Sequence, residues 1–157
     1  VYKLAAIKDP ETGEYIPKIK ISENVEKITN PGDKTIYRIY MKDTGKIEAD
    51  LIAFTSEHYD ENEDLLLFDP VETWKKTLLK GGTYRMEELL VKVFDKGRCV
   101  YHSPSAMELQ KICSNDLETL WEESKRLVNP HEVHVDLSKP LWDKKQELLD
   151  EYHGKNA

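Results

Sequence analysis

Cysteine is scarce in this sequence: 2 cysteines, Cys99 and Cys113, occur among 157 residues, and there is no CxxC pair. One lies in a strand-like run and the other in a helix-like run, so we expect buried thiols rather than a disulfide framework or a zinc site. Long hydrophobic runs are missing as well. No stretch approaches the ~20 apolar residues needed to cross a bilayer, and no signal peptide is present. We therefore expect a cytoplasmic protein without membrane contact.

Positive charge is in the minority. The chain has 23 Lys and Arg against 30 Asp and Glu, which gives a formal net charge of -7. Nucleic acids and anionic membranes bind clustered cations, so this balance argues against both as general partners. A hydrophobic fraction of 39% beside a charged fraction of 34% predicts a soluble domain with a modest core and a strongly solvated surface.

The sequence also lacks the motifs of many well-known active sites. The phosphate-binding GxGxxG and GxxxxGK[ST], the nucleophile elbow GxSxG and the zinc-binding HExxH are all absent. His131 and His134 stand beside acidic residues, but a polar linker between two helices explains them, because metal sites usually need three or four ordered ligands. Residues 56–64 are acidic without the spacing or glycine of an EF-hand, which indicates a solvated loop. We therefore predict no metal ligand in this chain.

Short strand-like runs fill the first two thirds of the chain. Isoleucines alternate with lysines and serine at residues 18–22, which predicts a half-buried strand with a basic outer face. Two longer runs, 35–42 and 47–54, are separated by a turn and predict a hairpin. Residues 71–79 fit either a strand or a short helix. Further strands are expected at residues 1–7, 65–68, 89–94 and 99–102.

The period of the apolar residues changes after the second hairpin. Ser103 or Ser105 can cap a helix, and Glu108, three residues after Ser105, would complete a capping box. Apolar residues then recur at helical spacing as far as residues 129–130, which predicts one long amphipathic helix. A final helix is expected from Ser138 onward, with a proline in its first turn. Antiparallel β-hairpins followed by two carboxy-terminal helices make an α+β fold. The lack of strand–helix alternation argues against a complete Rossmann fold or barrel.

One local excess of positive charge remains in this acidic chain. Lys20, Lys27 and Lys34 lie on a strand and a turn, together with Ser22, and Arg38 is on the following strand. Ammonium groups act as point charges on phosphate oxygens while a hydroxyl and turn amides donate hydrogen bonds, so this surface suits a polyphosphate. The alternative is a solvated strand face whose lysines protect an exposed edge from aggregation.

The same residues resemble a known family. The run K-x-S-x-N-x-x-K-x-x-x-P-G-x-K, from Lys20 to Lys34, resembles the segment that follows the barrel in bacterial nicotinate phosphoribosyltransferases. Each stretch has little specificity by itself, but five such stretches occur in the same order as in the family and span the whole chain. The other four are residues 1–4, residues 67–70, residues 120–123 with 129–130, and residues 135–138 with Trp142.

The resemblance implies that this chain is a fragment of a larger α/β-barrel phosphoribosyltransferase, in agreement with a chain that opens directly on a strand-like run. Residues 1–55 would complete the sheet domain of that enzyme, and residues 56–157 would form a carboxy-terminal α+β appendage. Enzymes of this family join nicotinate to phosphoribosyl diphosphate, with ATP hydrolysis through a phosphorylated histidine, and give nicotinate mononucleotide for NAD salvage. Mg²⁺ and ATP are implied for the whole enzyme, and no cofactor for this fragment alone.

The resemblance also implies roles for a few residues. Lys3, Lys20 and Lys27 match basic positions that approach the diphosphate or ATP phosphates in related phosphoribosyltransferases, often from the partner subunit of a homodimer. The family's catalytic groups lie upstream, so the resemblance implies no catalytic residue in this chain. We expect the isolated fragment to be inactive and to need the barrel of its own full-length chain. Two other interpretations stay open: a non-enzymatic acidic α+β module that binds another protein, and a small stand-alone enzyme that binds nucleotides through the basic turn.

Overall fold

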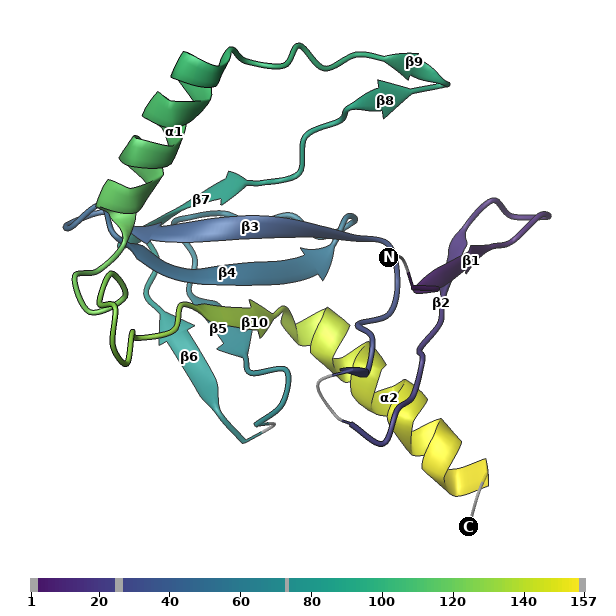
Figure 1. The fold of residues 1–157 in the computed structure, drawn as a ribbon. Helices are drawn as coiled ribbons and strands as arrows, with labels where there is room; N and C mark the ends of the chain where they lie inside the picture. The colour runs from purple at the N-terminus through teal and green to yellow at the C-terminus, as the bar shows by residue number, and fades with distance from the viewer. Residues whose placement is uncertain (1–2, 25–26, 73, 156–157) are drawn as a thin grey trace.

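A computed structural model describes residues 3–24, 27–72 and 74–155 of the chain. Within these residues most strands come first and the helices lie toward the carboxy terminus, which confirms the α+β class (Figure 1). The helices are α1 (Ala106–Thr119) and α2 (Lys139–Lys155). The strands are β1 (Ala6–Lys8), β2 (Tyr15–Pro17), β3 (Lys34–Met41), β4 (Ile47–Phe54), β5 (Leu65–Phe68), β6 (Lys76–Leu79), β7 (Tyr84–Glu88), β8 (Phe94–Asp95), β9 (Arg98–Cys99) and β10 (His134–Leu137).

Six of these strands form one mixed sheet in the order β6-β5-β10-β4-β3-β7. Neighbouring strands are antiparallel except for β10 and β4, which run parallel. Strand β6 ends at Leu79 and β7 begins at Tyr84, and five residue steps span at most about 18 Å. In a flat sheet of this size the two edge strands would lie about 24 Å apart, so the sheet must curl toward closure.

The concave side of this curled sheet holds the hydrophobic core. Alternation explains the contribution of β4, because every second residue from Ile47 onward is buried and those between are partly exposed. The cluster of buried core side chains is made by Ile39, Ala49, Leu51, Ala53, Leu65, Leu67, Leu79 and Tyr84.

The acidic loop of residues 56–64 closes the gap between the two edge strands. The backbone N–H of Gly82 donates to the Glu61 carbonyl at 2.7 Å, and the N–H of Met86 donates to the Glu61 carboxylate at 2.8 Å. Lys42 forms an ion pair with the same carboxylate at 3.1 Å. The Met86 N–H and then Lys42 hold the pKa of Glu61 below its ordinary value. The loop is therefore a structural part of the sheet as well as a solvated connection.

Helix α2 covers the convex face of the sheet at one end. Ser138 caps it, because its hydroxyl accepts a hydrogen bond from the Leu141 N–H at 3.3 Å. Leu141 is fully buried, and the ring of Trp142 lies 5.4 Å from that of Phe68 on β5. The capping residue Ser138 directly precedes the first buried turn of the helix, and α2 therefore begins where the sequence predicts.

Helix α1 is shorter than the sequence predicts. Its capping box is present, but the helix ends at Thr119 rather than near residue 129. The Lys46 ammonium donates to the carbonyl oxygens of Glu118 at 2.7 Å and Leu120 at 3.1 Å. This side chain satisfies carbonyl groups that the last turn leaves open, and Leu120 is already extended. In the described part of the chain, no helix is both long and apolar enough to cross a membrane.

Several local expectations were wrong. Residues 18–22 form no strand. The Lys20 N–H donates to the Thr29 hydroxyl rather than to the backbone of a neighbouring strand. Residues 134–137, expected in a polar linker, form the interior strand β10, and β7 was not expected at all. Cys99 and Cys113 are exposed rather than buried. The expected strand at 1–7 is limited to Ala6 onward, with residues 1–2 outside the described residues.

Candidate functional site

The candidate site is formed by residues 20–24 and 27–29, which we call the lysine loop. At its neck the Lys20 N–H donates to the Thr29 hydroxyl at 2.8 Å, and the Thr29 N–H donates to the Lys20 carbonyl at 3.3 Å. Lys27 lies on the same loop, and the Lys3 ammonium donates to its carbonyl oxygen at 3.4 Å. The fold therefore brings Lys3 next to Lys27, although 24 positions separate them in sequence.

The lysine loop is anchored at Pro31 and Gly32, the P-G pair of the motif. Both residues are buried, and the Gly32 N–H donates to the Ala5 carbonyl at 2.7 Å. Gly32 has a φ of +87°, and a Cβ at this position would lie 2.3 Å from a ring carbon of Phe54. Only glycine fits here, so the P-G pair has a structural reason.

Two other cations of the basic segment, Lys34 and Arg38, are engaged by the protein itself. Lys34 is partly buried, and its ammonium donates to the Gly32 carbonyl oxygen. Burial lowers the pKa of Lys34, and the Asp33 carboxylate opposes that shift. Arg38 makes a bidentate ion pair with Asp50, with N–O distances of 2.8 and 2.9 Å. Both side chains therefore have structural partners.

Lys3, Lys20 and Lys27 differ from those two cations because they are exposed to solvent. In the described part of the chain, none of the three forms an ion pair with a carboxylate. Exposed ammonium groups of this kind present point charges that suit phosphate oxygens. The chemistry they offer is neutralisation of an anion rather than proton transfer.

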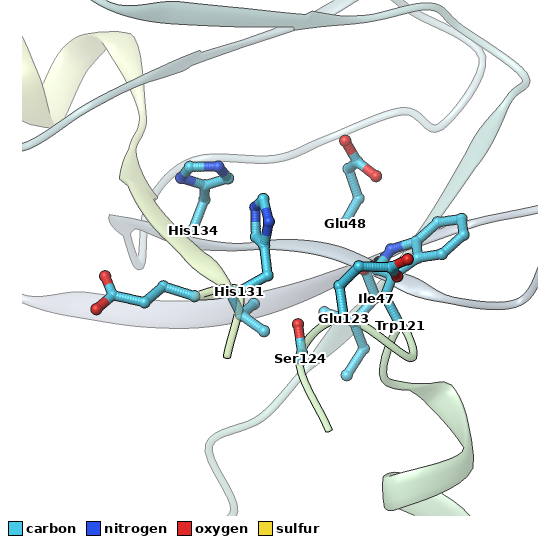
Figure 2. Close-up of a pocket in the computed structure, with 9 residues that line it drawn as sticks. Ile47, Glu48, Trp121, Glu123, Ser124, His131 and His134 are labelled. Atoms are coloured by element: carbon cyan, nitrogen blue, oxygen red, sulfur yellow. Dashed lines mark hydrogen bonds between the residues drawn. The ribbon is translucent and has the colours of Figure 1, made fainter. Parts of the chain in front are cut away.

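A separate hollow lies where the chain leaves α1 and approaches β10 (Figure 2). Its volume is about 330 Å³, and its wall is fixed by Trp121, whose indole N–H donates to the Ile47 carbonyl at 2.9 Å. His131 and His134 line it with ring centres 6.2 Å apart, and Figure 2 shows Glu48 on the other side of the hollow. Among the residues that the structure describes, no three His, Cys, Asp or Glu side chains are grouped to hold a metal ion.

Comparison with known proteins shows that this chain is similar to one family of enzymes. A sequence model of the nicotinate phosphoribosyltransferase C-terminal domain matches residues 33–145. The nicotinate phosphoribosyltransferase of Bacillus subtilis (strain 168) is 36% identical over 96% of this chain and 30% of its own length. That of Caenorhabditis elegans is 30% identical over 90% of this chain and 24% of its own length. The chain therefore spans less than a third of these relatives.

The fold has a counterpart among solved structures. The crystal structure of human nicotinic acid phosphoribosyltransferase matches with a TM-score of 0.68 and 23% identity, over 77% of this chain and 24% of the human chain. At that identity the likeness concerns the fold. The family model covers most of this chain and the bacterial relative nearly all of it, so the chain belongs to the nicotinate phosphoribosyltransferase family, as its C-terminal domain.

Proposed function

We propose that this chain works as the carboxy-terminal part of an enzyme that joins nicotinate to phosphoribosyl diphosphate, with ATP hydrolysis, to form nicotinate mononucleotide. The observation that carries the proposal is the 36% identity to the Bacillus subtilis enzyme over 96% of this chain. Within that enzyme the chain has a structural role and supports the phosphate site. It is not catalytic alone.

Lys3, Lys20 and Lys27 neutralise a diphosphate or ATP phosphate group in this proposal. The support is their exposure, the absence of carboxylate ion pairs to them in the described residues, and the hydrogen bonds that fix the neck of the lysine loop. Negative charge grows on a departing diphosphate, and positioned cations stabilise that charge without transferring a proton. Mg²⁺ shares this task in the whole enzyme.

The proposal extends to the organisation of the whole enzyme. The barrel of the same full-length chain supplies the catalytic groups, a homodimer completes the active site, and the enzyme acts in the cytoplasm. Residues 1–55 complete a sheet domain and residues 56–157 form an appendage. The two parts share one sheet within this chain: β3 and β4 come from before residue 55, and the other four strands of the six-stranded sheet come from after it.

The test is steady-state kinetics of the full-length enzyme carrying Lys20→Ala or Lys27→Ala. Each change removes charge-assisted contacts worth about 1.5–3 kcal/mol, so the KM for phosphoribosyl diphosphate or ATP should rise roughly 10- to 100-fold. The matched control is Lys111→Ala, an exposed lysine on α1 outside the motif, for which no change is expected. Unchanged KM values in both loop variants would reduce the lysine loop to a scaffold.

A second test uses the 157-residue chain alone, incubated with nicotinate, phosphoribosyl diphosphate, ATP and Mg²⁺. We expect no nicotinate mononucleotide by chromatography, because the chain offers cations but no catalytic group. Product above the level of a protein-free blank would contradict this part of the proposal.

A further inference from the structure

The exposed apolar surface of this chain is concentrated in one stretch. Among the residues that the structure describes, more than half of the large hydrophobic side chains that are exposed come from residues 90–135, which make up less than a third of the sequence. Exposed apolar side chains that lie together mark an interface in soluble proteins. The stretch lies inside residues 33–145, which match the family's C-terminal domain, so it belongs to that domain.

The first part of this surface is an open groove between α1 and the sheet, which we call the α1 groove. No residue of α1 is buried, although Leu109, Ile112 and Leu117 face the groove together with Val135 of β10. The groove has a volume of about 430 Å³. An amphipathic helix normally buries its apolar stripe, so α1 lacks the partner for which its sequence is suited.

The floor of the α1 groove carries charges that already neutralise each other. Arg38 and Asp50, opposite each other on β3 and β4, form the bidentate pair there. The hydrogen bonds that Arg38 donates to the Asp50 carboxylate raise the pKa of Arg38, and burial opposes the shift. A charged small ligand would have to compete with this pair, whereas an apolar protein surface can cover it. The groove therefore suits a protein better than a nucleotide or other anion.

The second part is an arm, residues 89–104, which extends away from the sheet between β7 and α1 (Figure 1). Its hairpin is held by the two residue pairs of β8 and β9 and by one hydrogen bond of 2.9 Å from the Val100 N–H to the Val93 carbonyl. Phe94 is 67% exposed and Val91 is 65% exposed. An isolated two-stranded hairpin is marginal in water, so this arm needs an external surface to hold it.

We propose that the α1 groove and the arm together form the docking surface for the part of the parent enzyme that lies outside this chain. This inference rests on the proposed function. The chain spans 24–30% of its enzyme relatives, so a much larger body must be accommodated. Residues 90–135 hold more than half of the exposed large hydrophobic side chains among the described residues. The lysine loop lies outside this surface, which leaves it available for the phosphate site.

Native cysteine reactivity tests the proposal without any substitution. Cys113 lines the α1 groove and Cys99 lies on the arm, and both are exposed in this chain. Alkylation with iodoacetamide, followed by mass spectrometry, should label both thiols quickly in the 157-residue chain. In the full-length enzyme Cys113 should react at least about tenfold more slowly, because a docked surface reacts only when it opens. Equal rates in the two proteins would overturn the proposal.

A second copy of the same chain is the competing occupant. If a second copy filled the α1 groove, the 157-residue chain would sediment as a dimer, and Cys113 would react more slowly as the protein concentration rises. That result would also overturn the proposal. We expect a monomer whose Cys113 reacts at a rate independent of concentration.

Matched variants of the full-length enzyme provide the second measurement. Ile112→Asp places a charge in the α1 groove and should raise the reactivity of Cys113 to that of the isolated chain. Lys111→Asp, one residue away and outside the groove lining, should leave it unchanged. Similar effects of the two variants would contradict the docking surface. Neither readout depends on the KM of a phosphate substrate, so failure of the lysine loop proposal and failure of this one are distinguishable.

Discussion

The hydroxyl proton of Tyr84 is shared between two carbonyl oxygens, that of Glu63 at an O–O distance of 2.9 Å and that of Asp60 at 3.3 Å. Tyr84 is the first residue of the edge strand β7 and is 1% exposed. Its ring belongs to the core cluster and its hydroxyl holds the loop that closes the sheet. One side chain thus connects the hydrophobic core to the seal between the two edge strands.

Tyr84→Phe should destabilise the chain while keeping its fold. The ring still fills the core, but two carbonyl groups lose their donor, which costs about 1–2 kcal/mol. Urea unfolding followed by circular dichroism measures the change. The control is Tyr101→Phe on the exposed arm, expected within about 0.5 kcal/mol of the wild type. Equal stability of the two variants would show that the Tyr84 hydroxyl does not hold the loop.

Gly81→Ala should be much more harmful than its small size suggests. A Cβ at Gly81 would lie 2.1 Å from the carbonyl oxygen of Asn62, a backbone atom that cannot move aside. Forcing a methyl group into such a contact costs typically about 1–3 kcal/mol and shifts the backbone. Thermal unfolding of Gly154→Ala, where nothing lies near the added methyl, is the matched comparison. A Gly81→Ala protein as stable as this control would contradict the close approach.

The Arg38–Asp50 pair should be coupled more strongly than the surface pairs of the chain. Its two side chains are 26% and 15% exposed, and both hydrogen bonds are short. A double-mutant cycle with alanine should give a coupling of about 1–3 kcal/mol in the free energy of unfolding.

The same cycle on Lys139 and Asp143, which are 57% and 48% exposed on α2, is the control for that measurement. An exposed i,i+4 pair is expected to give about 0.5 kcal/mol or less. Couplings of equal size would mean that burial at the floor of the α1 groove adds nothing to the Arg38–Asp50 pair.

Asp136 should give the stability of this chain a distinct pH dependence. It is 5% exposed, and burial raises the pKa of its carboxyl; His134 and Lys75 lower the pKa, and Asp69 raises it. The folded state then binds a proton more tightly than the unfolded chain. Above the raised pKa the buried charge lowers stability, and this penalty disappears as the pH falls through that pKa toward the unfolded value of about 3.9.

Asp136→Asn should therefore stabilise the chain at neutral pH, with a gain that shrinks as the pH is lowered toward about 4. Urea midpoints of variant and wild type at several pH values measure the difference in their stability. Titration of the other groups affects both proteins alike and cancels in this difference. Asp150→Asn, on the exposed side of α2, should show no such trend. A gain that grows with falling pH would refute the sign of this effect.

Elements were predicted well where a turn or a helix cap stood directly beside a clear apolar pattern. The run that follows the turn at residues 43–46 and the apolar run at residues 65–68 predicted β4 and β5 with the bounds that the structure shows. Ser138 before an apolar turn gave the start of α2. By contrast, β10 is four residues long with a buried aspartate at its third position, and its interior place depends on hydrogen bonds from β4 and β5.

The candidate site shows the same division. The motif from Lys20 to Lys34 directed attention to the lysine loop, and folding places the Lys3 ammonium beside the Lys27 carbonyl. The phosphate-binding role of Lys3, Lys20 and Lys27 stays a prediction. Thr29, which closes the loop, and Ala5, which anchors Gly32, had no signal in the sequence. Their roles come from backbone groups that meet only after folding.

By itself the sequence determined the α+β class, the family resemblance and the presence of one basic segment in an acidic chain, because composition, period and motif are local properties. Only the tertiary structure decided that the sheet curls, that α1 ends at Thr119 and that its apolar stripe stays uncovered. Lys46 reaches the end of α1 across 72 positions of sequence. Contacts over such separations depend on the path of the whole chain, which no local pattern of residues records.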